Sequence, residues 1–278
     1  MAEDLEPVTH ILIPDTQAKD DVPTDHLNWI GNYIVEEFHD KPIKIIHIGD
    51  HADMPALSLY DKGKRSMEGR RVKADIEAAN EAWRILNQPL YDFNDNRRKT
   101  KHAQWNPERF ITLGNHEDRI NRATENDAQI DGLFSIDDLD YARSGWEVVP
   151  FKVVKWIDGV AYSHFFYNPM TGQPYGGNIE TRLKNVGHSF SMGHQQTLLY
   201  GMRYVADKSQ HGLVAGACYL HDECYKGPQG NNHWRGIIVK HQVTEGQYDP
   251  MMVSLDYLCR RYEGTSLERF KKLKYPHM

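Results

Sequence analysis

Three short apolar runs in the first half of the chain each end abruptly in a carboxylate or amide side chain. They occupy residues 10–15, 45–50 and 110–115, whose last residues are Asp15, Asp50 and Asn115. Continuous apolar runs with little alternation are typical of strands buried on both faces of a sheet. If these strands are parallel, their polar ends meet at one edge of the sheet, where open α/β sheets bind ligands.

The segment between the first two runs has the pattern of an amphipathic helix. From about residue 25 to residue 39, the apolar residues fall on one helical stripe, which comprises Leu27, Ile30, Ile34, Val35 and Phe38. A strand, a helix and a second strand in this order predict a right-handed parallel crossover. The sequence therefore predicts an α/β fold with parallel strands at its centre.

The connection between the second and third runs is much longer than the dozen or so residues that a crossover needs. Apolar spacing predicts a helix within residues 68–90, and the polar, basic stretch 94–106 is typical of a loop. This helical and basic insertion, at about residues 54–108, follows the second run directly. We therefore expect it to contribute to substrate selection.

The second half of the chain is richer in β-type patterns. Residues 148–164 alternate like paired strands around the turn Asp158-Gly159, and a short strand over 189–193 ends at His194. Further strands are predicted over 213–219, 236–243 and 251–254. We expect a single domain over residues 1–278, with a β-rich C-terminal part at about 212–278.

Charge restricts the classes of partner. The 278-residue chain has a formal net charge of -6, so no global basic field draws it to nucleic acid. Local basic runs occur at 62–65, 70–73, 97–101 and 269–274. These runs are either solvated surface or contacts for a polyanionic substrate.

Cysteine usage and the N-terminus bear on the compartment. Cys218, Cys224 and Cys259 form no CxxC pair, which favours a reducing compartment, and we interpret Cys218 and Cys224 as packing residues. The acidic N-terminus has no apolar core of a secretory signal, and no apolar run approaches the roughly 20 residues of a membrane helix. These features predict a cytoplasmic protein without a membrane partner.

Five polar blocks follow apolar runs in a fixed order. They are Asp15-Thr16-Gln17, Gly49-Asp50-His51-Ala52-Asp53, Gly114-Asn115-His116-Glu117, Ser163-His164 and Gly193-His194-Gln195-Gln196. The series resembles the calcineurin-like metallophosphoesterase superfamily, whose blocks run D-x-H, G-D-x-x-D, G-N-H-E, a lone H and G-H-x-H. The stretch 219–223 is also similar to members encoded by tailed bacteriophages, which would place the protein in the host cytoplasm.

The resemblance implies a four-layer αββα sandwich of two mixed β-sheets flanked by helices, with two divalent metal ions. Asp50 would bridge the ions at a separation of roughly 3.5–4 Å. Asp15 would complete one side, and Asn115, His164 and His194 the other, a mixed nitrogen and oxygen set. Alone, each residue would be read as an ordinary turn or partly buried side chain, and their joint occurrence favours the metal centre.

The resemblance also implies the chemistry. In the family, a hydroxide that bridges the two metals attacks phosphorus in line with the leaving oxygen, without a covalent phosphoenzyme. His116 would stabilise or protonate that oxygen, and Asp53 would orient His116. His51 and Arg119 are the expected substrate contacts, although Arg119 with Arg122 also fits a solvated helical pair.

Two positions depart from the family pattern. Gln17 and Gln196 stand where the family has histidines that face the same metal. If both amides bind, that site becomes an all-oxygen set with Asp15 and Asp50, which favours Mn²⁺ or Mg²⁺ over Zn²⁺. Alternatively, both are surface amides. We expect manganese first, with Mg, Fe, Ni or Zn as other candidates.

Three functions remain open at this point. Protein phosphatases of the superfamily continue their second block with Arg-Gly, whereas Asp53 is followed here by Met54-Pro55. The first hypothesis is therefore a phosphodiesterase or nuclease acting on DNA. The second is a phosphomonoesterase acting on nucleotides or small phosphates, and the third is a metal-binding but inactive interaction scaffold. The sequence does not determine the oligomeric state.

Overall fold

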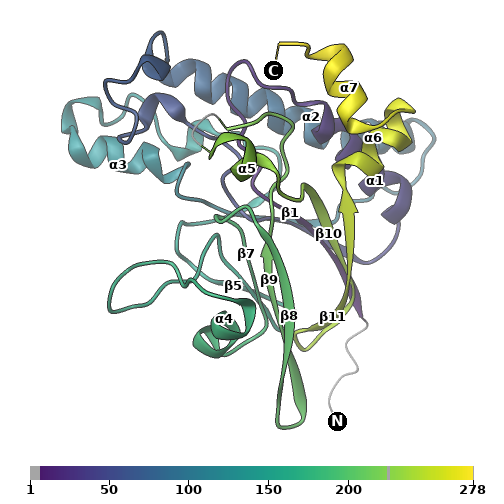
Figure 1. Ribbon diagram of the computed structural model, residues 1–278. Coiled ribbons are helices and arrows are strands. Elements are labelled where there is room, and N and C mark those ends of the chain that lie inside the picture. Colours follow the sequence, from purple (N-terminus) through teal and green to yellow (C-terminus); the bar gives the residue numbers. More distant parts are fainter. Residues whose placement is uncertain (1–6, 224–225, 278) are drawn as a thin grey trace.

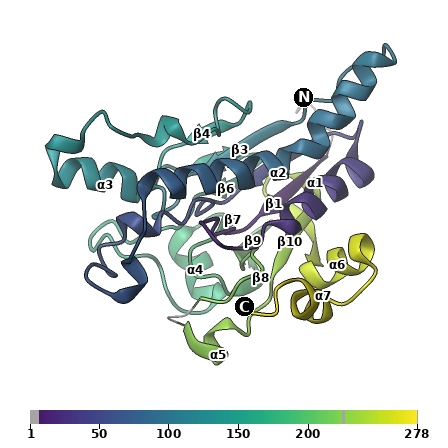
Figure 2. The ribbon, with the colours of Figure 1, turned by 90° about the horizontal axis from the view of Figure 1, so that it is seen from above.

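Two mixed β-sheets form the centre of the computed structural model, which describes residues 7–223 and 226–277 (Figures 1 and 2). The first has six strands in the order β11-β10-β1-β2-β3-β4. Its strands are β1 (Val8–Ile13), β2 (Ile43–His47), β3 (Glu108–Thr112), β4 (Glu147–Val149), β10 (Gly236–Thr244) and β11 (Gln247–Ser254). The second has five in the order β5-β6-β7-β9-β8. Its strands are β5 (Lys155–Ile157), β6 (Val160–Tyr162), β7 (Phe190–Met192), β8 (Leu198–Val205) and β9 (Lys208–Ala215).

Helices cover the outer faces of both sheets. Among them, α1 (Asp25–Phe38), α2 (Val72–Lys99) and α6 (Leu255–Glu263) lie on the first sheet, and α4 (Ile179–Val186) lies on the second. The remaining helices are α3 (Asp118–Asn126), α5 (Gly227–Asn231) and α7 (Leu267–Lys274), with short 3₁₀ turns at Pro55–Leu57, Arg65–Met67, Ala128–Ile130 and Ile136–Asp138. Figure 1 shows α1 and α2 on one side of the sheets and α4 on the other. The predicted four-layer αββα arrangement is confirmed.

The apolar runs are buried on both faces, as predicted. Strands β1, β2 and β3 are parallel neighbours. Along β1 and β2, Ile11 and Ile45 pack under the helices, whereas Leu12 and Ile46 pack against the second sheet. Full burial of each such side chain contributes about 1.5–3 kcal/mol. The continuous apolar pattern thus places these strands in the interior of the four layers. Because the strands are parallel, the polar residues that follow them lie at the same edge of the sheet.

Helix α2 extends beyond the prediction, because the expected loop 94–106 begins as helix. Asn94 is buried. Its side chain donates a hydrogen bond to Trp105 O and accepts one from Trp105 N, each at 2.8 Å, and these bonds stabilise the additional helical turn. Basic residues at the C-terminal end, including Arg98 and Lys99, pair with Asp95 and complement the helix dipole. The loop prediction was therefore wrong for residues 94–99, because these contacts stabilise a helix in spite of the polar composition.

The segment 148–164 is divided between the two sheets. Val148 and Val149 belong to β4, which lies parallel to β3, and only β5 and β6 form the hairpin around Asp158-Gly159. The prediction of one paired unit was wrong, because alternation reveals a strand but not its partner. Similarly, the strand predicted over 213–219 is β9, which ends at Ala215.

The C-terminal part is less β-rich than predicted, because α6 and α7 follow β11. Ser254 and Ser266 cap these helices by accepting hydrogen bonds from Tyr257 N and Arg269 N. Phe270 of α7 packs edge-on against Trp29 of α1. Tertiary packing on α1 therefore supports two helices whose own apolar stripes are short.

Two of the three cysteines can be placed in the structure. Cys218 and Cys259 are buried free thiols, and Cys224 lies outside the described residues. Across the described ranges, no helix combines the length and the apolar character needed to cross a membrane.

A lysine is buried between the two sheets. Lys240 of β10 is 0% exposed, donates a hydrogen bond to Tyr162 (3.0 Å) and contacts Ser191, and it lies 4.5 Å from the centres of the Tyr162 and Tyr248 rings. Burial lowers the pKa of Lys240 well below its ordinary value.

We expect Lys240→Met to change how stability depends on pH. The unfolded chain keeps a proton on Lys240 up to about pH 10, whereas the folded chain releases it at lower pH, so this residue makes stability rise with pH in that window. Urea unfolding at about pH 7 and about pH 9.5 should show the wild type gaining stability relative to the variant. A stability difference that stays the same at both pH values would contradict this assignment.

Candidate metal centre

The predicted ligands gather where strands of both sheets end. Asp15, Asp50 and Asn115 follow β1, β2 and β3, and His164 and His194 follow β6 and β7. Gly193 N donates to His164 O (2.9 Å), which ties the two histidine loops together. The carboxyl edges of the two sheets therefore bring together residues that are almost 180 positions apart in the chain.

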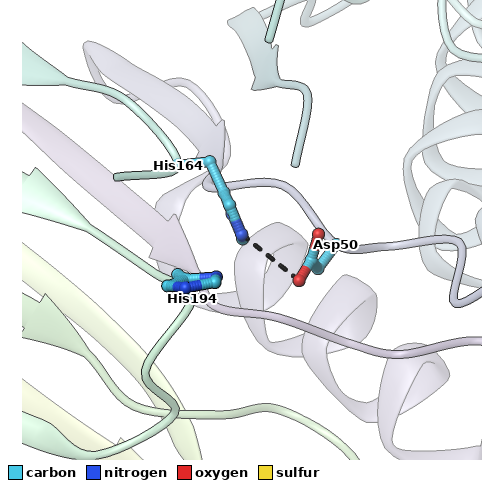
Figure 3. Close-up of side chains that lie close together, drawn as sticks. All are labelled: Asp50, His164 and His194. Atoms are coloured by element: carbon cyan, nitrogen blue, oxygen red, sulfur yellow. Dashed lines mark ion pairs between the residues drawn. The ribbon is translucent and has the colours of Figure 1, made fainter. Parts of the chain in front are cut away.

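Four side chains form a compact cluster, which we call the primary cluster: Asp50, Asn115, His164 and His194. Ligating atoms of Asp50, His164 and His194 all lie within 4.8 Å of one another. Asp50 Oδ2 is 3.2 Å from His164 Nε2, and these side chains point toward each other with His194 beside them (Figure 3). Asn115 Oδ1 lies 3.1 Å from His164 Nε2 and 2.7 Å from His194 Nδ1.

The hydrogen bonding of His164 prepares its Nε2 atom for a cation. Its Nδ1–H donates to Ile48 O (2.8 Å), so in the neutral ring the Nε2 lone pair faces the oxygens of Asp50 and Asn115. Three acceptors that converge in this way require a proton or a metal ion between them. Burial opposes the charge, but Asp50 raises the pKa of His164 to about 10 when no metal competes. The donor set fits a divalent metal ion that would replace this proton.

The backbone is strained at four predicted ligands. Gln17 (φ 49°), Asp50 (φ 49°), His194 (φ 67°) and Gln196 (φ 57°) adopt the left-handed conformation without being glycines. Such conformations are uncommon for these residues and persist where the surroundings enforce them, typically at functional sites. The loops thus hold these side chains in positions that relaxed turns would not provide.

Two glycines allow the loops to approach the carboxylates. A Cβ atom at Gly114 would overlap Asp50 Oδ1, and one at Gly193 would overlap Asp15 Oδ1. Larger residues at either position would push a carboxylate away from the site. The glycines of the third and fifth sequence blocks are therefore required by close packing around Asp50 and Asp15.

Glu117 joins the loops that follow β2 and β3. Its carboxylate is 0% exposed and accepts hydrogen bonds from the backbone N–H groups of Gly114 (2.9 Å), Asp50 (3.0 Å) and Ala52 (3.0 Å). The Tyr141 hydroxyl donates a fourth, at 3.2 Å. Burial, followed by the charge of Asp50, raises the pKa of Glu117. This one side chain fixes the backbone at Asp50 relative to the backbone at Asn115.

Asp15 is fully buried beside the primary cluster. It accepts hydrogen bonds from His194 N (3.1 Å to Oδ2), and burial together with repulsion by Asp50 raises the pKa of Asp15 to about 7. Two desolvated carboxylates at one site repel each other, and a nearby cation relieves that repulsion.

Neither glutamine is a surface amide, so that alternative is wrong. Gln17 is 1% exposed and donates from Nε2 to Asp50 Oδ2 (3.4 Å), and Gln196 is 6% exposed. Gln196 Oε1 accepts hydrogen bonds from the Tyr219 hydroxyl (2.8 Å) and from Lys226 Nζ. Both amides lie at the site, and both already form hydrogen bonds with other side chains of the protein.

His116 is held in place by Asp53. His116 Nδ1 lies 2.7 Å from Asp53 Oδ1, and His116 Nε2 lies 3.7 Å from Asp50 Oδ2. Burial opposes ionisation of Asp53, but the hydrogen bond from His116 and the charges of His116, Lys19 and Arg119 hold the pKa of Asp53 well below its ordinary value. Burial likewise opposes a charged His116, yet Asp50 and Asp53 raise its pKa.

Lys19 connects the His116–Asp53 pair to Glu223. Its Nζ donates to Asp53 Oδ2 and to Glu223 Oε1, each at 2.8 Å, and Glu223 in turn contacts His221 Nε2 at 2.9 Å. Lys19, Glu223 and His221 thus form a largely buried polar network next to Asp53.

Arg119 lies at the site, whereas His51 does not. Arg119 donates to Asp53 O (2.7 Å), and its Nη2 is 3.3 Å from His116 Nε2. His51 is fully buried, and its ring nitrogens contact Thr16 Oγ1 (2.7 Å) and Ala79 O (3.0 Å). The predicted substrate contact of His51 must therefore be corrected, because its ring packs under the site and not in a cleft.

A groove of about 960 Å³ opens beside the primary cluster. Asn115 and His194 line it, together with residues from the insertion (within 56–67), from α3 and from the stretch 151–174. Its cationic residues are Lys62, Arg119, Arg122 and Lys152, and its apolar and aromatic residues include Leu57, Leu59, Tyr60, Phe151 and Phe165. Of the four basic runs, only 62–65 contributes to this lining.

Several residues at the site were not identified from the sequence: Lys19, Glu117, Tyr141, Glu223 and Lys226. Glu117 stands inside the Gly-Asn-His-Glu block, so a signal for it was present. The others carry no local pattern, because only the folded chain brings Lys19 to Asp53 and Glu223, Tyr141 to Glu117, and Lys226 to Gln196.

Comparisons with known proteins add little. No family model and no curated protein matches the sequence. Among solved structures, Vps29 from Chaetomium thermophilum is similar over 88% of this chain and 97% of that one, at 7% identity and a TM-score of 0.34.

We expect Glu117→Gln to destabilise the fold. An amide replaces one acceptor oxygen by an NH₂ group, which leaves at least one buried backbone N–H unpaired at a cost of about 1–3 kcal/mol. Urea unfolding should show a lower free energy of unfolding for this variant. Glu125→Gln, at an exposed position of the helix α3 that follows Glu117, is the control and should change stability by less than about 0.5 kcal/mol. Equal stabilities of the two variants would refute the role given to Glu117.

Proposed function

We propose that this protein is a metal-dependent phosphodiesterase that cleaves nucleic acid, with DNA as the first substrate to test. The observation that carries the proposal is the meeting of three features at one place. These are the primary cluster, the His116–Asp53 pair 3.7 Å from its carboxylate, and the groove that Asn115 and His194 line together with four cationic side chains. Together they supply a metal site, a proton donor and a surface for a polyanion.

The residues of the chain have distinct tasks in this reaction. A bound divalent ion would polarise a phosphoryl oxygen and promote attack by water. His116 keeps its Nδ1 on Asp53, which leaves Nε2 to hold a proton for the departing oxygen. Burial opposes the charged ring, but Asp50 and Asp53 raise the pKa of His116 and so favour its protonated form. Arg119, beside Nε2, is placed to contact a second phosphoryl oxygen.

The size and lining of the groove favour a diester over a small monoester. Pockets of about 300–1,000 Å³ enclose whole drug-sized ligands, so the observed 960 Å³ far exceeds the needs of a phosphate group. Cationic side chains contact phosphates, and exposed aromatic rings such as Tyr60, which is 85% exposed, can stack on bases. A substrate with nucleotides on both sides of phosphorus would use both kinds of contact.

An inactive scaffold gains less support from the geometry. Such a protein has no need for a histidine held at 2.7 Å by a buried carboxylate, or for left-handed backbone at Asp50 and His194. These features are costly to stability, and they are explained when the site performs chemistry.

The substrate class is tested with purified protein and Mn²⁺. We expect turnover of a bis-aryl phosphate and of linear DNA, with little turnover of a mono-aryl phosphate. Turnover of the monoester alone would replace the diesterase proposal with a phosphomonoesterase. The lack of turnover with any divalent metal, in a protein shown to bind that metal, would favour the scaffold.

Two substitutions separate metal binding from proton transfer. Asp50→Asn should lose both bound metal and activity, because the carboxylate is the only anionic member of the primary cluster. His116→Ala should retain the metal but lower kcat by about 100-fold or more, since it removes the proton donor alone. Metal content is measured on the same samples. Wild-type rates in either variant would refute the proposed site.

A further inference from the structure

The second metal position of the family has an unusual set of neighbours in this chain. By the resemblance it would be bounded by Asp15, Gln17, Asp50 and Gln196. Neither glutamine carbonyl is placed to bind a metal ion in place of the family's imidazole rings. Gln17 turns its amide nitrogen toward Asp50 Oδ2 (3.4 Å), so it acts there as a donor and not as a ligand. At Gln196, both lone pairs of Oε1 are used by donors from the chain.

One of those donors is a cation. Lys226 Nζ donates to Gln196 Oε1 and to the Tyr219 hydroxyl (3.1 Å), and it lies 5.9 Å from the centre of the Tyr219 ring. The Tyr219 hydroxyl itself donates to Gln196 Oε1 at 2.8 Å. Burial lowers the pKa of Lys226, and the negative charges of Glu223 and Asp15 oppose that shift by attracting the ammonium group. A lysine cation is therefore held at the one amide that would otherwise ligate the second ion.

The fold delivers Lys226 to this position. After β9 the chain runs alongside the end of β1, where Cys218 N donates to Asp15 O (2.8 Å) and Ala217 forms a bridge with Asp15. Tyr219 follows directly and is fully buried, stacked against His221 with ring centres 4.7 Å apart. Residues 217 and 218 are thus anchored to Asp15, a predicted ligand of the second ion.

We propose that the ammonium group of Lys226 takes the place of the second metal ion, so that the chain binds one divalent ion, at the primary cluster. The inference rests on the metal centre of the proposed function and deepens it. An ammonium group supplies one positive charge near Asp15 without needing imidazole ligands, and it repels a second divalent ion. The loss of both family histidines and the presence of Lys226 then have a common explanation.

The number of bound ions is the direct test. The wild-type protein is dialysed against Mn²⁺, its metal content is measured by mass spectrometry, and the bound Mn²⁺ is examined by electron paramagnetic resonance. We expect one ion per chain with the signal of an isolated Mn²⁺. Two ions per chain with the signal of an exchange-coupled pair would overturn this inference alone. No bound ion would overturn the metal centre of the proposed function as well.

Variants at position 226 test whether the lysine is responsible. Lys226→Met should bind a second Mn²⁺ at least about tenfold more tightly than the wild type and should acquire the coupled signal, because the competing charge is gone. Lys226→Arg keeps the charge and should remain at one ion. Lys208→Met, which removes a surface lysine paired with Glu245, is the matched control and should also remain at one. A Lys226→Met protein that binds one ion at every Mn²⁺ concentration would overturn the role of Lys226. Circular dichroism verifies folding, and the wild-type stoichiometry stands as a test in its own right.

Discussion

The buried carboxylate of Glu117 is the interaction on which the site depends. Two loops leave the sheet side by side, and each has backbone N–H groups that point inward without partners in a strand. Glu117 accepts from Gly114, Asp50 and Ala52, so a single anion satisfies donors from both loops. Removing these hydrogen bonds would release the left-handed turn at Asp50 and, with it, the position of the central ligand.

Charge balance explains much of what surrounds that anchor. Asp15, Asp50, Asp53 and Glu117 are all nearly inaccessible to water, and buried carboxylates are stable only when cations or N–H donors face them. Asp53 has Lys19 and His116, and Glu117 has backbone donors. Asp15 and Asp50 accept hydrogen bonds from the backbone N–H groups of His194 and His116 and lie beside imidazole rings. One divalent ion at the primary cluster would complete the charge balance.

The strands that carry the candidate ligands, and the polar residues that end these strands, were predictable because both are local features of the sequence. A buried parallel strand has a continuous apolar pattern, and its last residue must lie at the sheet edge. The roles of His51 and Gln196 were not predictable in this way. His51 sits in an apolar environment beside Trp83 that only the insertion helix creates, and Gln196 meets Lys226 across 30 positions of sequence. The end of α2 was missed for the same reason, since its support from Trp105 is tertiary.

The most direct measurement is anomalous X-ray scattering from a crystal grown with Mn²⁺. One strong anomalous peak is predicted among Asp50 Oδ2, Asn115 Oδ1, His164 Nε2 and His194 Nδ1, at coordination distance from each. The ammonium group of Lys226 is expected beside Gln196, with no peak next to it. A primary cluster without anomalous density, in which His164 remains in direct contact with Asp50, would contradict a metal-dependent site.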